Sequence, residues 1–312
     1  MRHYRVCGVT IASDRPLPEL VPVRPMRRPQ WTVRTCPTRD VRAAWFHHVK
    51  FPDGKRWMSI ARDVEHYTVK FWRHATFEID LNTREIVSRA ARRTPAETVR
   101  HLLLDQVIPL IATSRDRIAL HGSAVATRGG AVAFVGAAGA GKSTIAALLA
   151  TTGLPVVADD CLLVERRRGR LVAIPNYPGL RLWPDAAAAL FAGASPSLAP
   201  VAHYTTKRRV GESVLPFARV RTPLRRIYLL GARPTAGASR VAILRRAAAP
   251  AMVDLLKCVH CLDVGDRARI CQIFDLVGAI ASGTPIRTLA FRRNLSRVNE
   301  LRDAVLADLD DD

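Results

Sequence analysis

Lysine is scarce in this chain of 312 residues, although basic residues are abundant. Only six of its 48 lysines and arginines are lysine: Lys50, Lys55, Lys70, Lys142, Lys207 and Lys257. With 27 acidic residues the formal net charge is +21, which ordinarily suggests a nucleic acid or an anionic membrane as partner. The bias toward arginine, alanine and proline is, however, typical of a GC-rich genome, and the arginines are spread along the chain. We therefore do not expect nucleic acid as the partner, and the short basic clusters at 166–168 and 207–209 favour an acidic peptide instead.

Long hydrophobic runs are also missing, because charged residues interrupt every apolar stretch before it reaches membrane-spanning length. Residues 1–6 do not have the pattern of a signal peptide. Of six scattered cysteines, only Cys258 and Cys261 have metal-like spacing, and no second Cys/His pair follows at a finger-like distance. We expect a cytoplasmic protein with reduced thiols and no membrane contact, and an ordinary helix over 250–262 in preference to a zinc site.

The length of the chain predicts two domains. Residues 1–92 are expected to form a β-rich module, because apolar and polar residues alternate there as they do in half-buried strands. Strands are predicted at 57–61, 67–73, 77–81 and 85–87, the last two as a hairpin. Residues 93–312 are expected to form the second domain.

A helix is predicted near the start of this second domain. Thr94 is the expected N-cap, Pro95 the first helical residue and Glu97 the closing residue of a capping box. Pro109 is expected to bend the end of the helix. Further strands are predicted at 118–125, 131–135, 154–158, 162–165, 171–174 and 224–230, and helices at 185–193, 250–262 and 295–309.

Residues 136–143 (Gly-Ala-Ala-Gly-Ala-Gly-Lys-Ser) match the whole phosphate-binding pattern G-x-x-x-x-G-K-[ST]. They stand between an apolar run typical of a buried parallel strand and a helical stretch that begins at Lys142. Glycines let backbone N–H groups approach phosphate oxygens, and a helix N-terminus favours negative charge. Lys142 is predicted to contact the β- and γ-phosphates, and the Ser143 hydroxyl to bind Mg²⁺. The predicted nucleotide-binding residues are Gly136, Ala137, Ala138, Gly139, Ala140, Gly141, Lys142, Ser143 and Thr144.

Two adjacent carboxylates, Asp159 and Asp160, follow the predicted strand 154–158. Ligands of open α/β sheets bind at the carboxyl ends of the strands. One carboxylate could hold Mg²⁺ together with Ser143, and the other could accept a proton from an incoming hydroxyl. The alternative interpretation of the pair is one metal ligand and a solvated neighbour. His121 stands at another predicted strand end, and by itself it would be structural.

Together, His121, the loop 136–143 and Ala-Asp-Asp at 158–160 resemble the catalytic domain of the HPr kinase/phosphorylase family of bacterial P-loop serine kinases, over roughly residues 115–290. The resemblance implies an α/β fold in which an HPr-kinase-like P-loop catalytic domain (93–312) follows a smaller β-rich N-terminal domain (1–92). Because that family forms hexamers, it also implies that a homo-oligomer is possible.

The resemblance further implies a role for each matching residue. His121 would assist near the transferred phosphate, and Lys142 would neutralise its charge. Ser143 and Asp160 would bind Mg²⁺. Asp159 would be the base toward a serine hydroxyl, and the two aspartates could be exchanged in role.

The chain departs from the bifunctional members of that family at two points. Thr144 follows the loop serine where those enzymes usually carry an acid, and residues 175–184 replace their downstream signature. The resemblance therefore does not extend to phosphorolysis or to HPr itself as the substrate. The opening segments 4–10 and 17–20 and the segment 178–183 look more like the HPr-kinase-like subgroup linked to peptide natural products, including lasso-peptide precursor kinases. Within the last of these segments, Arg181 is a candidate for stabilising transition-state charge, and the cluster 207–209 is a candidate for closing over nucleotide or substrate.

The sequence thus predicts a kinase that uses ATP and Mg²⁺ to phosphorylate a Ser or Thr hydroxyl of a peptide or protein, with the N-terminal module contributing to recognition of the acceptor. Three alternatives stay open. The first is a nucleotide-gated binding protein without phosphotransfer. The second is a nucleic-acid-dependent ATPase, which the charge suggests but no recognisable nucleic-acid module supports. The third is a kinase with the same chemistry that phosphorylates a small molecule.

Overall fold

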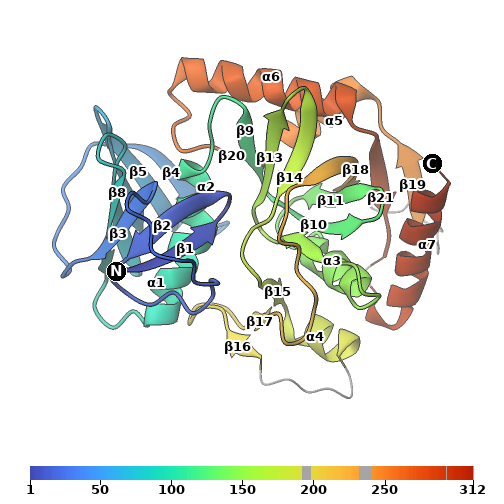
Figure 1. Cartoon of the computed structure of the whole chain (residues 1–312), viewed down its shortest axis with the longest axis horizontal. Coiled ribbons are helices and arrows are strands. Elements are labelled where there is room, and N and C mark those ends of the chain that lie inside the picture. Colours follow the sequence, from blue (N-terminus) through green and yellow to red (C-terminus); the bar gives the residue numbers. More distant parts are fainter. Residues whose placement is uncertain (192–197, 232–240, 293, 312) are drawn as a thin grey trace. The chain divides into compact units, whose positions relative to one another are not determined.

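The structure is a computed structural model of the whole chain. It describes residues 1–191, 198–231, 241–292 and 294–311. The chain forms two compact units (Figure 1). The N-terminal unit comprises Met1–Ala112 together with Val201–Thr205, and the C-terminal unit comprises Thr113–Pro200 and Thr206–Asp312. The boundary predicted after residue 92 lies before a helical segment that groups with the N-terminal unit in the structure.

All of residues 1–112 are described, and eight strands among them form one sheet in the order β1-β2-β3-β8-β7-β6-β5-β4. The strands are β1 (Arg2–Val6), β2 (Val9–Ser13), β3 (Trp31–Thr35), β4 (Trp45–Lys50), β5 (Arg56–Asp63), β6 (His66–Phe71), β7 (Ala75–Asp80) and β8 (Glu85–Ala90). β3 pairs in parallel with β2 and β8, and the other neighbours are antiparallel. The strands predicted by alternation are confirmed, including the hairpin, whose turn is closed by backbone N–H groups of Asn82 and Thr83 that donate to Asp80 Oδ1.

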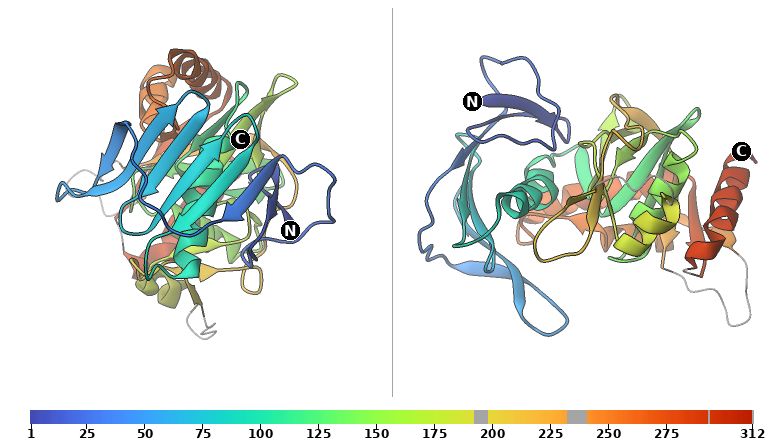
Figure 2. Two further views of the ribbon diagram at one scale, coloured as in Figure 1. Left: turned by 90° about the vertical axis from the view of Figure 1, so that its left-hand side faces the viewer. Right: turned by 90° about the horizontal axis from the view of Figure 1, so that it is seen from below.

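A helical segment lies on the concave side of this sheet (Figure 2, right). It consists of α1 (Ala96–Leu102), a π-helical turn (Leu103–Val107) and α2 (Ile108–Ile111). The predicted helix is confirmed, but its predicted capping box is wrong. Pro95 is the N-cap in an extended conformation (ψ 148°), and the Thr94 hydroxyl lies 3.5 Å from the carbonyl oxygen of Arg73. The π turn precedes Pro109, because proline has no N–H to donate to the preceding turn and its ring crowds that turn.

The segment Val201–Thr205 completes the N-terminal unit with an aromatic cluster. The ring of Tyr204 packs against Trp57 (centroids 5.1 Å apart) and His74 (4.9 Å). Thr98 Oγ1 accepts a hydrogen bond from the backbone N–H of His203 and lies 2.8 Å from the Nδ1 of its ring. The chain therefore enters this unit twice, once from its start and once from the middle of the sequence.

In the described part of the C-terminal unit, ten strands form the main sheet and three form a small one. The main sheet contains β9 (Arg117–Leu120), β10 (Gly122–Thr127), β11 (Gly130–Gly136), β12 (Val156–Ala158), β13 (Leu162–Arg167), β14 (Arg170–Ile174), β18 (Thr222–Leu230), β19 (Ala242–Arg245), β20 (Val259–His260) and β21 (Ile286–Ala290). The small sheet contains β15 (Leu180–Leu182), β16 (Ala199–Pro200) and β17 (Arg208–Val210). β11, β18 and β21 are mutually parallel, and β12 pairs with β10, which is itself antiparallel to β11.

The helices of this unit are α3 (Lys142–Ala150), α4 (Pro184–Leu190), α5 (Ala248–Leu256), α6 (Arg267–Gly283) and α7 (Val298–Asp310), with a 3₁₀ turn at Leu295–Arg297. The mixed α/β fold that the sequence predicts is what the structure has. The C-terminal part of the predicted helix 185–193 (192–193) lies outside the described residues. The predicted helix 250–262 is wrong after Leu256, where β20 follows, and α6 was not predicted at all.

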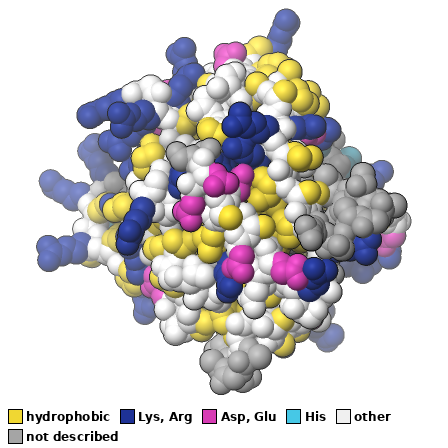
Figure 3. Space-filling model, turned by 90° about the vertical axis from the view of Figure 1, so that its right-hand side faces the viewer, with side chains coloured by type: hydrophobic (Ala, Val, Ile, Leu, Met, Phe, Trp, Pro, Cys, Tyr) yellow, Lys and Arg dark blue, Asp and Glu magenta, His cyan; other side chains and the backbone are white. Residues whose placement is uncertain are grey.

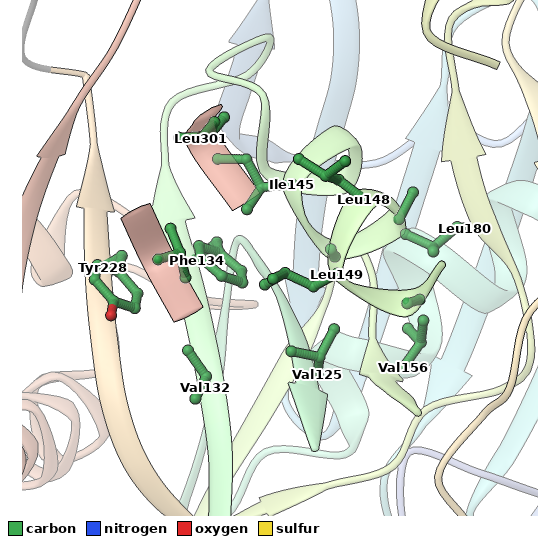
Figure 4. Packing of buried hydrophobic residues seen from close by; sticks show 14 of the residues in the cluster. Val125, Val132, Phe134, Ile145, Leu148, Leu149, Val156, Leu180, Tyr228 and Leu301 are labelled. Atoms are coloured by element: carbon green, nitrogen blue, oxygen red, sulfur yellow. The ribbon is translucent and has the colours of Figure 1, made fainter. Parts of the chain in front are cut away.

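The strand β11 is buried along its whole length between two apolar layers. Val132 and Phe134 belong to one cluster with the apolar side of α3, and Ala131, Ala133 and Val135 belong to the other, on the side of α5 and α6. Figure 4 shows the first cluster, in which Phe134 lies between Leu149 of α3 and Tyr228 of β18. Because the side chains of β11 alternate between these two layers, the orientation of the strand is fixed. The position of the loop that follows its carboxyl end is fixed with it.

Two general properties of the chain bear on its partners. No helix in the described part of the chain is both long enough and apolar enough to cross a membrane. On the face that Figure 3 shows, the basic side chains of the described residues are dispersed among apolar and acidic ones.

Candidate functional site

The phosphate-binding loop connects β11 to α3, as its sequence predicts. Gly141 is the N-cap of α3 with φ +101°, and Gly139 has φ +74°. A Cβ atom at Gly136 would lie 2.5 Å from the carbonyl oxygen of Leu230, and one at Gly141 would lie 3.2 Å from the ring of Phe291. Glycine is required at these positions because a side chain would clash or strain the backbone, so the loop owes its shape to its sequence.

The side chain of Lys142 folds back over this loop. Its Nζ donates hydrogen bonds to the carbonyl oxygens of Gly136 (2.9 Å) and Ala137 (2.8 Å), and the residue is only 5 % exposed. Burial lowers the pKa of Lys142, and the carboxylates of Asp160 and Asp159 act in the opposite direction. The loop therefore contains a desolvated cation at the start of a helix.

A cleft of about 850 Å³ opens beside the loop and α3, which is within the size range of small-molecule sites. Six of the predicted nucleotide-binding residues line it: Ala138, Gly139, Gly141, Lys142, Ser143 and Thr144. Gly136 and Ala137 instead border a smaller cavity of about 330 Å³, and Ala140 is buried in the apolar cluster with α3. His121, Asp160 and Arg181 line the larger cleft as well, so four segments distant in the sequence meet there.

Asp159 is brought to the edge of this region, but its carboxylate is fully buried (0 % side-chain exposure). Ser123 Oγ donates to Oδ1 at 2.6 Å, and the backbone N–H of Arg181 donates to Oδ2 at 2.8 Å. Arg181 Nη1 adds a contact to Oδ2 at 3.4 Å. Both carboxylate oxygens are therefore occupied by protein donors.

Asp160, in contrast, keeps a partly exposed side chain (20 %) and lines the cleft. Its backbone has φ +58°, a left-handed conformation that few residues other than glycine adopt. One of its carboxylate oxygens forms an ion pair with Nε of Arg181 (3.6 Å). The adjacent aspartates thus face different surroundings because the backbone turns sharply between them.

Arg181 lies between the two carboxylates. It is 2 % exposed, and its guanidinium contacts the backbone carbonyls of Asp159 and Gly179 as well as the hydroxyl of Tyr177. The centre of the Tyr177 ring lies 5.0 Å from the central carbon of the guanidinium. A cation held in this way offsets part of the negative charge of the two aspartates and fixes their side chains.

His121 occupies the break between β9 and β10, which the sequence predicts as one strand. The break arises because β9 pairs with β13 and β20, whereas β10 pairs with β11 and β12. His121 Nδ1 lies 3.1 Å from the carbonyl oxygen of Asp160. Because a carbonyl oxygen only accepts, Nδ1 carries the proton, and Nε2 is the acceptor atom of the neutral ring. Burial lowers the pKa of His121, and so does the nearby Lys142.

A second histidine in this region was not predicted. β20 pairs with β9, and its register places His260 opposite Ala119, so that the His260 ring stands edge-on to His121 with centroids 5.9 Å apart. Within the described residues, the buried Nε2 of His260 has no hydrogen-bond partner. Burial, followed by the neighbouring His121, lowers the pKa of His260 to about 4. Local sequence gave no signal for it, because the contact depends on pairing between distant strands.

His260 should make the protein less stable in mild acid. Its pKa in the folded protein lies below its ordinary value of 6.5, so the unfolded chain binds the proton more readily. The stability contribution is fully present above pH 6.5 and falls as the pH drops toward 4, by about 3 kcal/mol in the free energy of unfolding. Urea unfolding between pH 4.5 and 7.5 should show a shallower pH dependence for His260→Gln than for the wild type. Equal slopes would contradict a neutral buried His260.

The described residues contain no cluster of three or more His, Cys, Asp or Glu side chains with the geometry of a metal site. Magnesium does not need such a cluster, since it is commonly held by one or two protein oxygens together with substrate phosphates. Ser143 and Asp160 both line the cleft and provide hard oxygen donors of this kind. The donor set therefore fits Mg²⁺ bound with a nucleotide.

No family model and no curated protein matches the chain. Among solved structures, it is similar to the Hpr(Ser) kinase/phosphatase from Coxiella burnetii. The two share 11% sequence identity with a TM-score of 0.32, over 62% of this chain and 99% of that chain. A likeness at this level is a distant structural relation at most, and the function is therefore inferred from the residues of the cleft.

Proposed function

We propose that this protein is a kinase that transfers the γ-phosphate of ATP, with Mg²⁺, to a Ser or Thr hydroxyl of a peptide or protein. One observation carries the proposal. A single cleft combines the lysine and serine of a phosphate-binding loop with a carboxylate, Asp160, and an imidazole, His121. A loop and a helix N-terminus alone support nucleotide binding, whereas an adjacent carboxylate that is open to the cleft also supports transfer.

The phosphates bind at the loop and the first turn of α3. Backbone N–H groups of the loop and the helix N-terminus contact phosphate oxygens, and Lys142 exchanges its loop carbonyls for the β- and γ-phosphates. Ser143 and Asp160 would hold Mg²⁺, which would supply charge neutralisation at the phosphates. Arg181 keeps Asp160 in place.

In the transfer step, the acceptor oxygen forms a bond to the γ-phosphorus, and the bond from that phosphorus to the bridging oxygen of ADP breaks. The hydroxyl proton passes to the carboxylate of Asp160, which would also be a ligand of the metal. Asp159 is a positioning residue, because its own oxygens are occupied by Ser123 and Arg181. The resemblance implies Asp159 as the base and Asp160 as the metal ligand, whereas we assign both roles to Asp160.

The sequence resemblance supports the proposed acceptor class, and a carboxylate open to the cleft suits a hydroxyl acceptor. A ribosomal precursor peptide, the kind of acceptor that the HPr-kinase-like subgroup implies, is one member of this class. The cytoplasm, where ATP and reduced thiols occur together, is the proposed place of reaction.

The test is intact-mass spectrometry of Ser- and Thr-containing peptides after incubation with the protein, ATP and Mg²⁺. We expect a gain of one phosphate group that disappears with Lys142→Met and with Asp160→Asn. Phosphate release from ATP in the absence of any phosphorylated peptide would instead indicate hydrolysis, and it would count against this proposal.

A second candidate function is a nucleotide-gated binding protein that transfers no phosphate. The observation that favours it is the buried Asp159, which leaves one carboxylate to serve both metal and hydroxyl. This alternative predicts tight ATP binding, unchanged peptide masses, and a partner affinity that changes when ATP is added.

A further inference from the structure

The small sheet beside the cleft has one apolar face and one polar face. In the β15–β17 ladder, Leu180 pairs with Val210 and Leu182 pairs with Arg208. The side chains of Leu180, Leu182 and Val210 are buried in the apolar cluster with α3. Because side chains alternate along a strand, Arg181 and Trp183 extend from the opposite face. Lys207, which precedes β17, lies across the ladder from Trp183.

Trp183 and Lys207 form a pair on this polar face. Lys207 Nζ stands 5.5 Å from the centre of the Trp183 ring, within the range of a cation–π contact. Both residues line the cleft, and Trp183 remains 48 % exposed. A large exposed aromatic ring beside a cation, in the same cleft as Lys142, is a binding surface that the nucleotide chemistry above does not use.

The order of the strands indicates which substrate this pair meets. In the main sheet, β12 lies on one side of β11, and β18 with β21 lies on the other. Asp160 follows β12, whereas Phe291 follows β21 and touches the loop at Gly141. Asp160 and Phe291 therefore lie on opposite sides of the phosphate-binding loop. If the γ-phosphate lies beside Asp160, the nucleoside lies on the side of Phe291. Trp183, two residues after Arg181, lies at the Asp160 end, where the acceptor has to enter.

We infer that Trp183 and Lys207 form the acceptor subsite and that they select a peptide with an acidic residue close to its reactive hydroxyl. The inference rests on the proposed function. The ring of Trp183 offers apolar surface for the peptide, and the ammonium of Lys207 attracts its carboxylate. Asp185, which also lines the cleft, is exposed, and its Oδ1 accepts a hydrogen bond from the N–H of Ala186 on its own helix. A single ring also differs from the successive rings on which nucleic-acid bases stack.

The experiment uses two synthetic heptapeptides, each with one central serine, flanked on both sides by three glutamates or by three lysines. Binding to the full chain is measured by fluorescence anisotropy of labelled peptide, with a non-hydrolysable ATP analogue and Mg²⁺ present. We expect the glutamate peptide to bind, and its affinity to fall with added salt. Lys207→Met and Trp183→Ala should each weaken it by roughly fivefold, as expected for contacts of this type. Affinity for the ATP analogue should stay the same.

The matched control is Arg208→Met, which removes the same charge from the neighbouring residue on the opposite face of the ladder. Equal losses for Lys207→Met and Arg208→Met would overturn the subsite, since only general charge would then matter. Weaker binding of the ATP analogue by Trp183→Ala, or a preference for the lysine peptide or for a single-stranded oligonucleotide, would overturn it as well. A third outcome is that Lys207→Met weakens binding of the glutamate peptide, Arg208→Met does not, and no phosphate is transferred from ATP. This outcome would support the subsite and count against the kinase.

Discussion

Asp160→Asn is expected to lower the turnover number for phosphate transfer by about 10³-fold, because it removes the one carboxylate of the pair that is open to the cleft. Its amide is neutral, so it is a weaker ligand for Mg²⁺ and cannot take up the proton of the hydroxyl. Affinity for ATP should lose most of its dependence on Mg²⁺ in this variant. The folded structure should persist, since the side chain is partly solvated.

Asp159→Asn should mainly lower the stability of the protein, in contrast to Asp160→Asn, which should mainly lower turnover. It removes a buried charge and leaves Arg181 without its closest counterion, so the free energy of unfolding should drop by about 3 to 5 kcal/mol. Turnover per folded molecule should fall much less than in Asp160→Asn. Urea unfolding and active-site-normalised kinetics on the same samples separate the two effects.

The control for both variants is Asp116→Asn, which removes an exposed carboxylate whose partner is Arg166 on the surface. It should change stability by less than about 1 kcal/mol and leave turnover unaffected. If Asp159→Asn abolished turnover while the protein stayed as stable as the wild type, the roles proposed for the two aspartates would be wrong.

The second large effect is expected for Lys142→Met, which should weaken ATP binding by about 100- to 1,000-fold, the loss expected when two charge-assisted hydrogen bonds to phosphate are removed. The stability of the nucleotide-free protein should change by no more than about 1 kcal/mol. Two effects oppose each other there, because the loop carbonyls lose a donor while a desolvated ammonium is removed.

Isothermal titration with ATP and Mg²⁺ measures this affinity, and thermal unfolding without nucleotide measures the stability. Lys55→Met serves as the control, since that lysine is exposed and lies in the N-terminal unit. Unchanged ATP affinity in Lys142→Met would mean that the loop does not bind phosphate in this protein.

Local sequence was sufficient for the strand, loop and helix around residues 131–150. An apolar run, three glycines and a helical stretch each restrict the backbone without help from distant residues, and the structure has β11, the loop and α3 where they were predicted. The polar face formed by Arg181 and Trp183 was also accessible to sequence analysis, because the alternation in Leu-Arg-Leu-Trp places them on one side of a strand.

Tertiary contacts decided what local sequence could not predict. The stretch 250–262 has the composition of one helix, yet pairing with β9 turns its end into β20 and moves His260 beside His121. The different environments of Asp159 and Asp160 depend on Ser123, a strand residue with no distinguishing local pattern, and on the left-handed backbone at Asp160. The sequence identified the candidate residues but could not tell which of the two aspartates faces the cleft.

The second entry of the chain into the N-terminal unit limits how the protein can be dissected. Val201 and Ala202 are each only 1 % exposed, and Tyr204 packs against Trp57 and His74. Removing residues 1–112 would leave this five-residue segment without the surface that buries it and would expose apolar side chains in the middle of the remaining polypeptide. A shortened protein of this kind is expected to aggregate for reasons unrelated to acceptor recognition. The contribution of the N-terminal unit is therefore better measured by surface substitutions in the intact chain than by truncation.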